Sequence, residues 1–117
     1  MIDSLLQPSV SASLAAPPAD PADGDVFRIA SGASGFWSGR DDQLAIWLAG
    51  AWRYVLPRHG MRVYDRQAGQ FILFRDGWHA ASAAAPPQGG GVIDVEARTA
   101  IAEIAETLRA AGIVPPA

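Results

Sequence analysis

The chain has 117 residues, of which 50% are hydrophobic and 18% are charged, and its formal net charge is -3. This length fits one domain or a small domain with appendages, and the hydrophobic content is typical of a folded chain rather than a disordered one. The acidic balance gives no reason to expect nucleic-acid binding, and a chain without cysteine has neither disulfides nor thiolate metal sites.

Residues 1–24 are rich in alanine, serine and proline, as in the run SVSASLAAPPADPADG. This composition predicts an extended N-terminal arm with polyproline character. The segment lacks the basic start and long apolar run of a secretion signal, and no stretch approaches the roughly 20 apolar residues of a membrane span. We therefore expect a protein that is made in the cytoplasm and not inserted in a membrane.

Residues 25–82 contain every tryptophan and tyrosine, and their apolar residues recur with a period close to two. Six candidate strands follow one another: DVFRIA, QLAIWL, AWRYVL, MRVYD, QFILFR and GWHAA. Ala49-Gly50 and Asp76-Gly77 are two-residue hairpin links. The predicted fold is mainly β, a small antiparallel meander barrel or sandwich with an extended N-terminal arm and one C-terminal α-helix.

The four tryptophans have different expected environments. Trp52 and Trp78 each follow a turn glycine, and they either cover the ends of the core or contact a ligand. The core role is favoured, because small β-domains need large aromatic residues to fill their interiors. Trp47 lies in the apolar run LAIWL and is expected in the core. Trp37 is surrounded by turn-forming residues in SGASGFWSGRDD, which predicts a loop position suited to binding.

The sequence offers no convincing catalytic or metal-binding pattern. Asp41 and Asp42 are adjacent and would face opposite sides of a strand, so they make a poor catalytic carboxylate pair. His59 and His79 lack the spacing of a metal motif, and GASGFWSG lacks the ending of a phosphate-binding loop. We therefore predict a non-enzymatic protein without catalytic residues, metal or cofactor.

The C-terminal part divides into a linker and a helix. Residues 83–91, AAAPPQGGG, predict a flexible linker, and within residues 92–117 Asp94 is the expected N-cap of a helix that ends near Gly112. Five small or apolar residues, spaced alternately four and three apart, form a predicted oligomerisation seam: Ala97, Ile101, Ile104, Leu108 and Ala111. A solitary helix of this length is marginal in water, so the seam either docks on the β-domain or joins a parallel homotrimer. The narrow seam, the flexible linker and the isoleucine at both kinds of seam position favour the trimer.

Residues 17–80 resemble a family of domains of unknown function that occurs in tail-fibre, head-spike and related proteins of bacteriophages and gene transfer agents. The motifs that carry the resemblance are ordered along the chain: a Pro-Pro start, the loop GFWSG, the hairpin GAW, the corner PRHG and the final DGW. The resemblance implies a particle-surface protein, made in the bacterial cytoplasm and assembled on a phage or phage-like particle. It brings no catalytic residue set with it.

The leading hypothesis is a trimeric fibre or spike component that attaches the particle to a host surface by binding glycan. The alternative is a structural adaptor that joins other virion proteins through its N-terminal arm or C-terminal helix. A wall-degrading enzyme is a third and weaker hypothesis. Because sugar rings pack on aromatic planes while Arg and Asp bind hydroxyl groups, we predict a shallow saccharide site. Its residues are Trp37, Arg40, Asp41, Arg53, Tyr54 and Trp78. Aromatic residues exposed in a groove would favour attachment, whereas a buried set would favour the adaptor.

Overall fold

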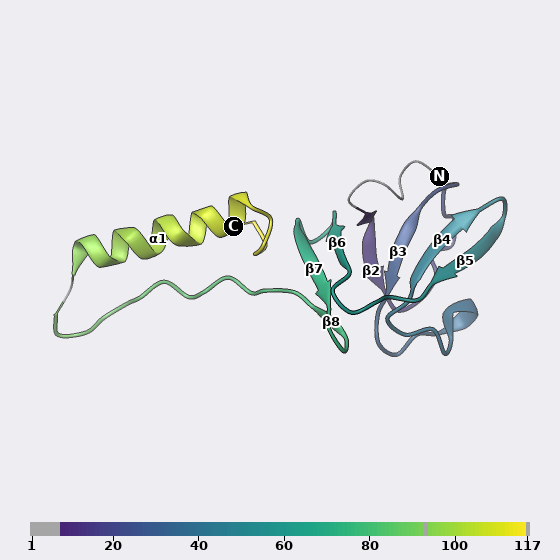
Figure 1. Ribbon diagram of the computed structural model, residues 1–117, viewed down its shortest axis with the longest axis horizontal. Coiled ribbons are helices and arrows are strands. Elements are labelled where there is room, and N and C mark those ends of the chain that lie inside the picture. The colour runs from purple at the N-terminus through teal and green to yellow at the C-terminus, as the bar shows by residue number, and fades with distance from the viewer. Residues whose placement is uncertain (1–7, 93, 117) are drawn as a thin grey trace.

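A computed structural model of the chain describes residues 8–92 and 94–116, which form two four-stranded sheets and a C-terminal helix (Figure 1). The first sheet has the strand order β1-β6-β7-β8, and the second has the order β2-β3-β4-β5. The strands are β1 Ser9–Val10, β2 Ala12–Leu14, β3 Val26–Ile29, β4 Leu44–Leu48, β5 Ala51–Val55, β6 Arg62–Asp65, β7 Gln70–Phe74 and β8 Trp78–His79. A 3-10 helix, η2, spans Gly35–Trp37, and helix α1 spans Val95–Ala110. The predicted mainly β fold is confirmed, as two sheets rather than a closed barrel.

All six strands expected from residues 25–82 are present, as β3 to β8. The β4–β5 hairpin turns at Ala49 and Gly50, whose φ angles are 50° and 77°. Positive φ at both central residues is the mark of a type I′ turn, whose twist matches that of the flanking strands. The turn sets the register of the hairpin, in which Trp47 lies directly opposite Trp52.

The N-terminal segment differs from the extended arm that its composition predicted, because it contributes one strand to each sheet. β1 pairs in parallel with β6 of the first sheet, and β2 pairs in parallel with β3 of the second. The side chain of Val10 is completely buried. Ser11 alone separates the two strands, so residues 9–14 form one extended bridge between the sheets.

A buried carboxylate fastens this bridge. Asp65, at the end of β6, is only 5% exposed, and its Oδ2 accepts a hydrogen bond of 2.9 Å from the Ser13 hydroxyl. Its Oδ1 accepts hydrogen bonds of 3.0 Å from the backbone N–H groups of Gln67 and Ala68. The Arg28 Nε donates to the Ser13 hydroxyl oxygen at 2.9 Å. Asp65 therefore shapes the β6–β7 turn and ties it to β2 in the other sheet.

The second sheet is packed on both of its faces. Leu44 of β4 joins a cluster with residues of the first sheet, Val10, Val63 and Ile72, so this core lies between the sheets. Its chain neighbour Ala45 points to the opposite face, because successive strand residues alternate. On that outer face lies a second cluster, which contains Phe27, Ile29, Trp37 and Ala45.

The outer face is covered by two connections. Residues 15–25 cross from the end of β2 to the start of β3, which is the crossover that parallel strands require. Residues 30–43 join β3 to β4 and carry η2. The two connections are linked where the Ser34 N–H donates to the carbonyl oxygen of Ala15 at 3.0 Å.

Helix α1 and the linker before it project from the sheets as an arm (Figure 1). Asp94 caps the helix as expected, since its Oδ1 accepts a hydrogen bond of 2.9 Å from the Ala97 N–H. No residue of α1 is buried, and the molecule measures 60 × 31 × 27 Å. Residues 8–92 and 94–116 include no helix with the length and hydropathy of a membrane span.

The base of this arm is held by β7, where the short β8 leaves part of the sheet edge open. The Phe71 N–H donates to the carbonyl oxygen of Gly112 at 2.6 Å. The side-chain amide of Gln70 donates to the carbonyl oxygens of Ala81 and Ile113, at 2.8 and 3.1 Å. Gln70 therefore clamps the first residues after β8 and the residues after α1 to the same point.

We expect Asp65→Ala to lower the free energy of unfolding by about 2–4 kcal/mol, because it removes a buried carboxylate and leaves three partly buried donors without their acceptor. Ser13→Ala removes one of these three bonds and the bond from Arg28 Nε, but it keeps both backbone bonds to Asp65, and it should cost about 1–2 kcal/mol. Urea unfolding of the full chain measures both values. Glu103→Ala, on the exposed surface of α1, is the matched control, and a loss for Asp65→Ala no larger than that of the control would contradict the bridging role.

Candidate functional site

Trp37, the first residue of the predicted saccharide site, lies in the outer core of the second sheet. It is 0% exposed, and its ring centroid is 5.1 Å from that of Trp52 and 6.1 Å from that of Phe27. The expected surface role of Trp37 is therefore wrong. Its place in a turn-rich loop predicted exposure, but the loop folds back and uses the indole to cover the sheet.

The neighbour of Trp37 in the chain has the opposite environment. Phe36 is 84% exposed and belongs to the same 3-10 turn. The Tyr54 hydroxyl donates a hydrogen bond of 3.2 Å to the carbonyl oxygen of Phe36. This bond holds the turn to β5, so the burial of Trp37 and the exposure of Phe36 are fixed together.

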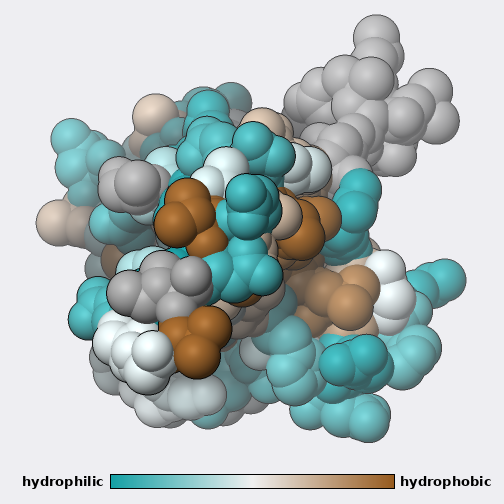
Figure 2. All heavy atoms as spheres, turned by 90° about the vertical axis from the view of Figure 1, so that its left-hand side faces the viewer, coloured by the Kyte–Doolittle hydropathy of each residue, from teal (hydrophilic) through white to brown (hydrophobic). Residues whose placement is uncertain are grey.

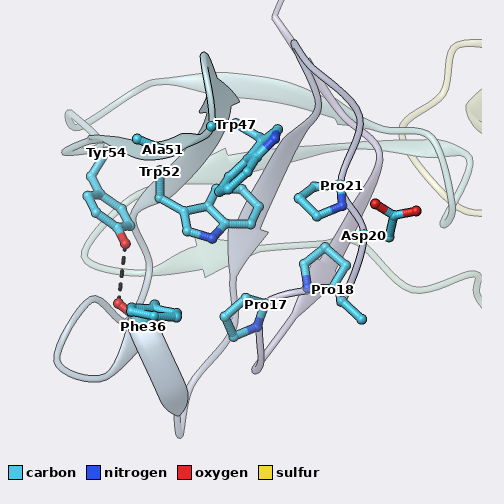
Figure 3. Close-up of a pocket in the computed structure, with 11 residues that line it drawn as sticks. Pro17, Pro18, Asp20, Pro21, Phe36, Trp47, Ala51, Trp52 and Tyr54 are labelled. Atoms are coloured by element: carbon cyan, nitrogen blue, oxygen red, sulfur yellow. Dashed lines mark hydrogen bonds between the residues drawn. The ribbon is translucent and has the colours of Figure 1, made fainter.

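Phe36 forms one side of a groove of about 590 Å³ over the outer face of the second sheet (Figure 3). This volume lies within the roughly 300–1,000 Å³ of typical small-molecule sites. Four aromatic side chains line the groove: Phe36, Trp47, Trp52 and Tyr54. The crossover supplies the opposite side, with Pro17, Pro18, Asp20 and Pro21.

Trp52 is held rigidly at the centre of this groove. The ring centroids of Trp47 and Trp52 are 5.0 Å apart, with the planes at 65°. Beneath them, Trp37 and Phe27 pack against Trp52 at interplanar angles of 72°. Edge-to-face contacts of this kind are favourable, so Trp52 presents a fixed surface to the groove.

A charged side chain outside the groove lining stacks on Tyr54, which does line the groove. The guanidinium carbon of Arg40 lies 3.8 Å from the Tyr54 ring centroid, a cation–π contact. Arg40 Nη1 also donates to Gln43 Oε1 at 3.4 Å. Arg40 is exposed, and a stacked guanidinium keeps donors in its plane that can bind hydroxyl or carboxylate groups.

The structure brings together only part of the predicted site. Arg40 and Tyr54 are in contact, but the exposed Asp41 is used by its own loop, because its carboxylate accepts hydrogen bonds of 3.1 Å from the N–H groups of Gly32 and Ala33. Arg53 is exposed on the face of β5 opposite to that of Tyr54.

Trp78 is also separate from the groove. Its indole N–H donates to the carbonyl oxygen of Asp42 at 2.7 Å, and its ring packs against the core between the sheets. It therefore has the structural role that the sequence favoured for it, and it does not line the groove with the other aromatic residues.

The predicted site omitted three aromatic residues of the groove, Phe36, Trp47 and Trp52, and the prolines on its opposite side. Trp47 was expected in the core, yet Trp47 and Trp52 are half-buried and line the groove. The hairpin pattern held the necessary information, because a two-residue turn at Ala49-Gly50 places positions 47 and 52 opposite each other on one face. No such local pattern exists for the prolines, whose place depends on the crossover.

The helical seam of the arm is largely open. Ile101 is 44% exposed and Ile104 is 61% exposed. Instead of docking on the sheets, α1 faces its own linker across a gap of about 410 Å³, which Pro86, Pro87 and Leu108 help to line. Figure 2, which faces the outer end of the arm, shows apolar groups interspersed with polar ones.

Among residues 8–92 and 94–116, the structure contains no group of three or more His, Cys, Asp or Glu side chains that could hold a metal ion. The fold and the groove define a small two-sheet β module with an aromatic surface groove and a projecting C-terminal helix. Residues 1–79 match the family DUF2793, described as a protein of unknown function, and the chain belongs to this family. No curated protein matches the sequence.

The contrast between Trp37 and Phe36 gives a direct test of the site's geometry. We expect Trp37→Ala to destabilise the fold by about 3–5 kcal/mol, since it opens a cavity in the outer core. Phe36→Ala should change the free energy of unfolding by less than about 0.5 kcal/mol. Thermal and urea unfolding of the two variants measure the difference, and equal losses would show that the turn is not placed as described.

Proposed function

We propose that this protein is a non-enzymatic attachment module that binds saccharide in the groove lined by Phe36, Trp47, Trp52 and Tyr54. The observation that carries the proposal is the exposure of several aromatic planes around one groove of ligand size. The C–H faces of sugar rings pack on such planes, and their hydroxyl groups bond to polar groups at the rim. Asp20 in the groove lining and Arg40, which stacks on Tyr54, supply such groups.

The rigidity of the groove supports this proposal. Trp52 is locked by Trp37 and Phe27, and Phe36 is held by its backbone bond to Tyr54. A surface that is already ordered loses little conformational entropy on binding, which helps a weak ligand such as a sugar. The groove is lined by other residues than the predicted site, apart from Tyr54. The proposed binding still uses aromatic planes together with an Arg and an Asp side chain.

The chemistry of the groove supports binding without catalysis. Glycoside hydrolysis normally uses two carboxyl groups that flank the scissile bond. Among the described residues that line the groove, only Asp20 carries a carboxylate. This lining supports the proposal of a module that holds its ligand without cleaving it.

The proposed setting is the surface of a phage or a gene transfer agent, as a fibre or spike component assembled after synthesis in the bacterial cytoplasm. The support for this setting is the resemblance of the motifs in residues 17–80 to domains of such particles. Family membership by itself names no particle and no ligand. In this setting the ligand is a polysaccharide of the host surface.

We also propose that three copies assemble in parallel through α1. The exposed Ile101 and Ile104 and the absence of any buried residue in α1 support this assembly. The linker that lies beside the seam would move aside, and Gly89, Gly90 and Gly91 give it the freedom to do so. Three weak sites on one particle could raise the avidity by ~10² or more. The exposed seam equally favours the alternative adaptor, in which α1 joins another particle protein.

Saccharide binding is tested with the full chain on a glycan array and on polysaccharide extracted from candidate host cells. We expect Phe36→Ala and Arg40→Ala to remain folded and to weaken binding about tenfold or more, a loss of about 1.4 kcal/mol. Leu56→Ala removes an exposed apolar residue outside the groove and should bind normally. Unchanged binding by both variants, or no glycan bound by the unmodified chain, would contradict the saccharide site. The adaptor would then be the remaining hypothesis.

Trimerisation is tested by sedimentation velocity of the full chain at micromolar concentration. Ile104→Asp should convert a trimer to a monomer, because an unpaired charge in the seam is costly to bury. Val92→Asp changes an exposed residue outside the seam and should leave the trimer intact. A monomeric mass for the unmodified chain would contradict the proposed assembly without bearing on saccharide binding.

A further inference from the structure

The four sheet edges of this fold are unequal. The edge strands β1 and β8 have two residues each and β2 has three, whereas β5 has five. Short edge strands present few unpaired backbone groups to other chains. β5 is therefore the edge at which another strand could pair over a useful length.

The hydrogen bonds of β4 show which backbone groups of β5 point away from the sheet. The Trp47 N–H donates to the Asp25 carbonyl oxygen at 2.9 Å, and the Trp47 carbonyl oxygen accepts from the Gly24 N–H at 2.7 Å. The backbone of Trp47 thus faces β3, and that of the next residues on either side faces β5.

Because Arg53 lies opposite Ile46, the backbone of Arg53 bonds to β4, while the backbone groups of Trp52 and Tyr54 point outward. No backbone hydrogen bond joins these outward groups to another segment of the described chain. β5 therefore offers two N–H donors and two carbonyl acceptors in a row.

This edge also lacks the usual protection against pairing. β5 contains no proline or lysine, and its only charged residue is Arg53. The same two residues whose backbone points outward, Trp52 and Tyr54, line the aromatic groove with their side chains. A strand added to β5 would place alternate side chains at the groove, which is how strand-adding domains obtain specificity.

The charge of Arg53 decides between two kinds of partner. In the antiparallel register that overlaps two copies of β5 completely, Arg53 would lie directly opposite itself. Like charges in that position are destabilising. No ion pair joins Arg53 to a residue in the described ranges, so an acidic residue of a partner can take this position.

We propose that the β5 edge binds an extended segment of another protein by strand addition. The segment carries an acidic residue opposite Arg53 and apolar side chains toward the aromatic groove. Its main-chain hydrogen bonds are made with Trp52 and Tyr54. This interaction depends on the sheet edge and does not require the proposed saccharide binding.

The experiment selects binders for the full chain from an mRNA-displayed library of linear nonapeptides and then tests the selected peptides as synthetic molecules. We expect them to carry Asp or Glu at one fixed position with alternating apolar residues around it. N-methylation of the peptide amides that face β5 should weaken binding about tenfold or more. N-methylation of the amides in between, which face away from β5, should leave binding unchanged. In amide NMR spectra, the Trp52 and Tyr54 signals should shift on binding.

The matched variant is Arg53→Glu, which changes an exposed side chain outside the groove. It should reverse the preference, so that a Lys version of each peptide binds better than the acidic version. No selected peptide, peptides insensitive to N-methylation, or an unchanged preference would each overturn the proposal. Dimerisation of the chain through β5 would also overturn it and assign the edge to a second copy. Saccharide binding should be the same in Arg53→Glu, which separates this proposal from the proposed function.

Discussion

The fold depends on the pairing of residues 9–14 with both sheets, and the hydrogen bond between Ser13 and the buried Asp65 holds this segment in place. Residues 9–14 pair with β6 in one sheet and with β3 in the other, so one extended segment joins two units that are otherwise consecutive meanders. Val10 fills the core between the sheets, and Ser13 reaches the carboxylate that shapes the β6–β7 turn. Without this segment, neither sheet would have its parallel edge strand.

The bridge formed by residues 9–14 also determines where the groove lies. Since β2 and β3 run parallel, the chain between them must cross back over one face of the second sheet. It crosses the outer face, where its prolines line the groove. The prolines form one side of the groove, and the loop with η2 packs Trp37 beneath Trp52. Trp47 and Trp52 stay half-buried between them. The same cluster of rings thus forms a core below and the surface of the groove above.

The C-terminal arm has a different kind of connection to the domain. Gln70 and Phe71 hold its base through hydrogen bonds to the carbonyl oxygens of Ala81, Gly112 and Ile113, while the helix itself buries no residue. A helix of this length gains little stability from propensity alone. Its seam therefore leaves apolar surface exposed, as at Ile101 and Ile104. In the proposed assembly, this surface would be buried against a further chain.

The sequence by itself determined the local structure of this protein. The period of two, the turn residues Ala49-Gly50 and the N-cap Asp94 predicted the strands β3 to β8, one hairpin register and the start of α1, because these features depend on residues close together in the chain. The resemblance of its motifs also pointed to a family of domains of unknown function, and the match to DUF2793 over residues 1–79 places the chain in such a family.

The tertiary structure alone decided the role of residues 9–14 and the composition of the candidate site. A segment of small residues and prolines has the composition of a linker, and only its distant partners β6 and β3 make it a pair of strands. Trp37 and Phe36 are adjacent in one loop, so their composition and spacing give no reason to bury one and expose the other. The direction in which that loop folds over the sheet sets the difference, and it follows from long-range contacts with Phe27, Trp52 and Tyr54 that no local pattern encodes.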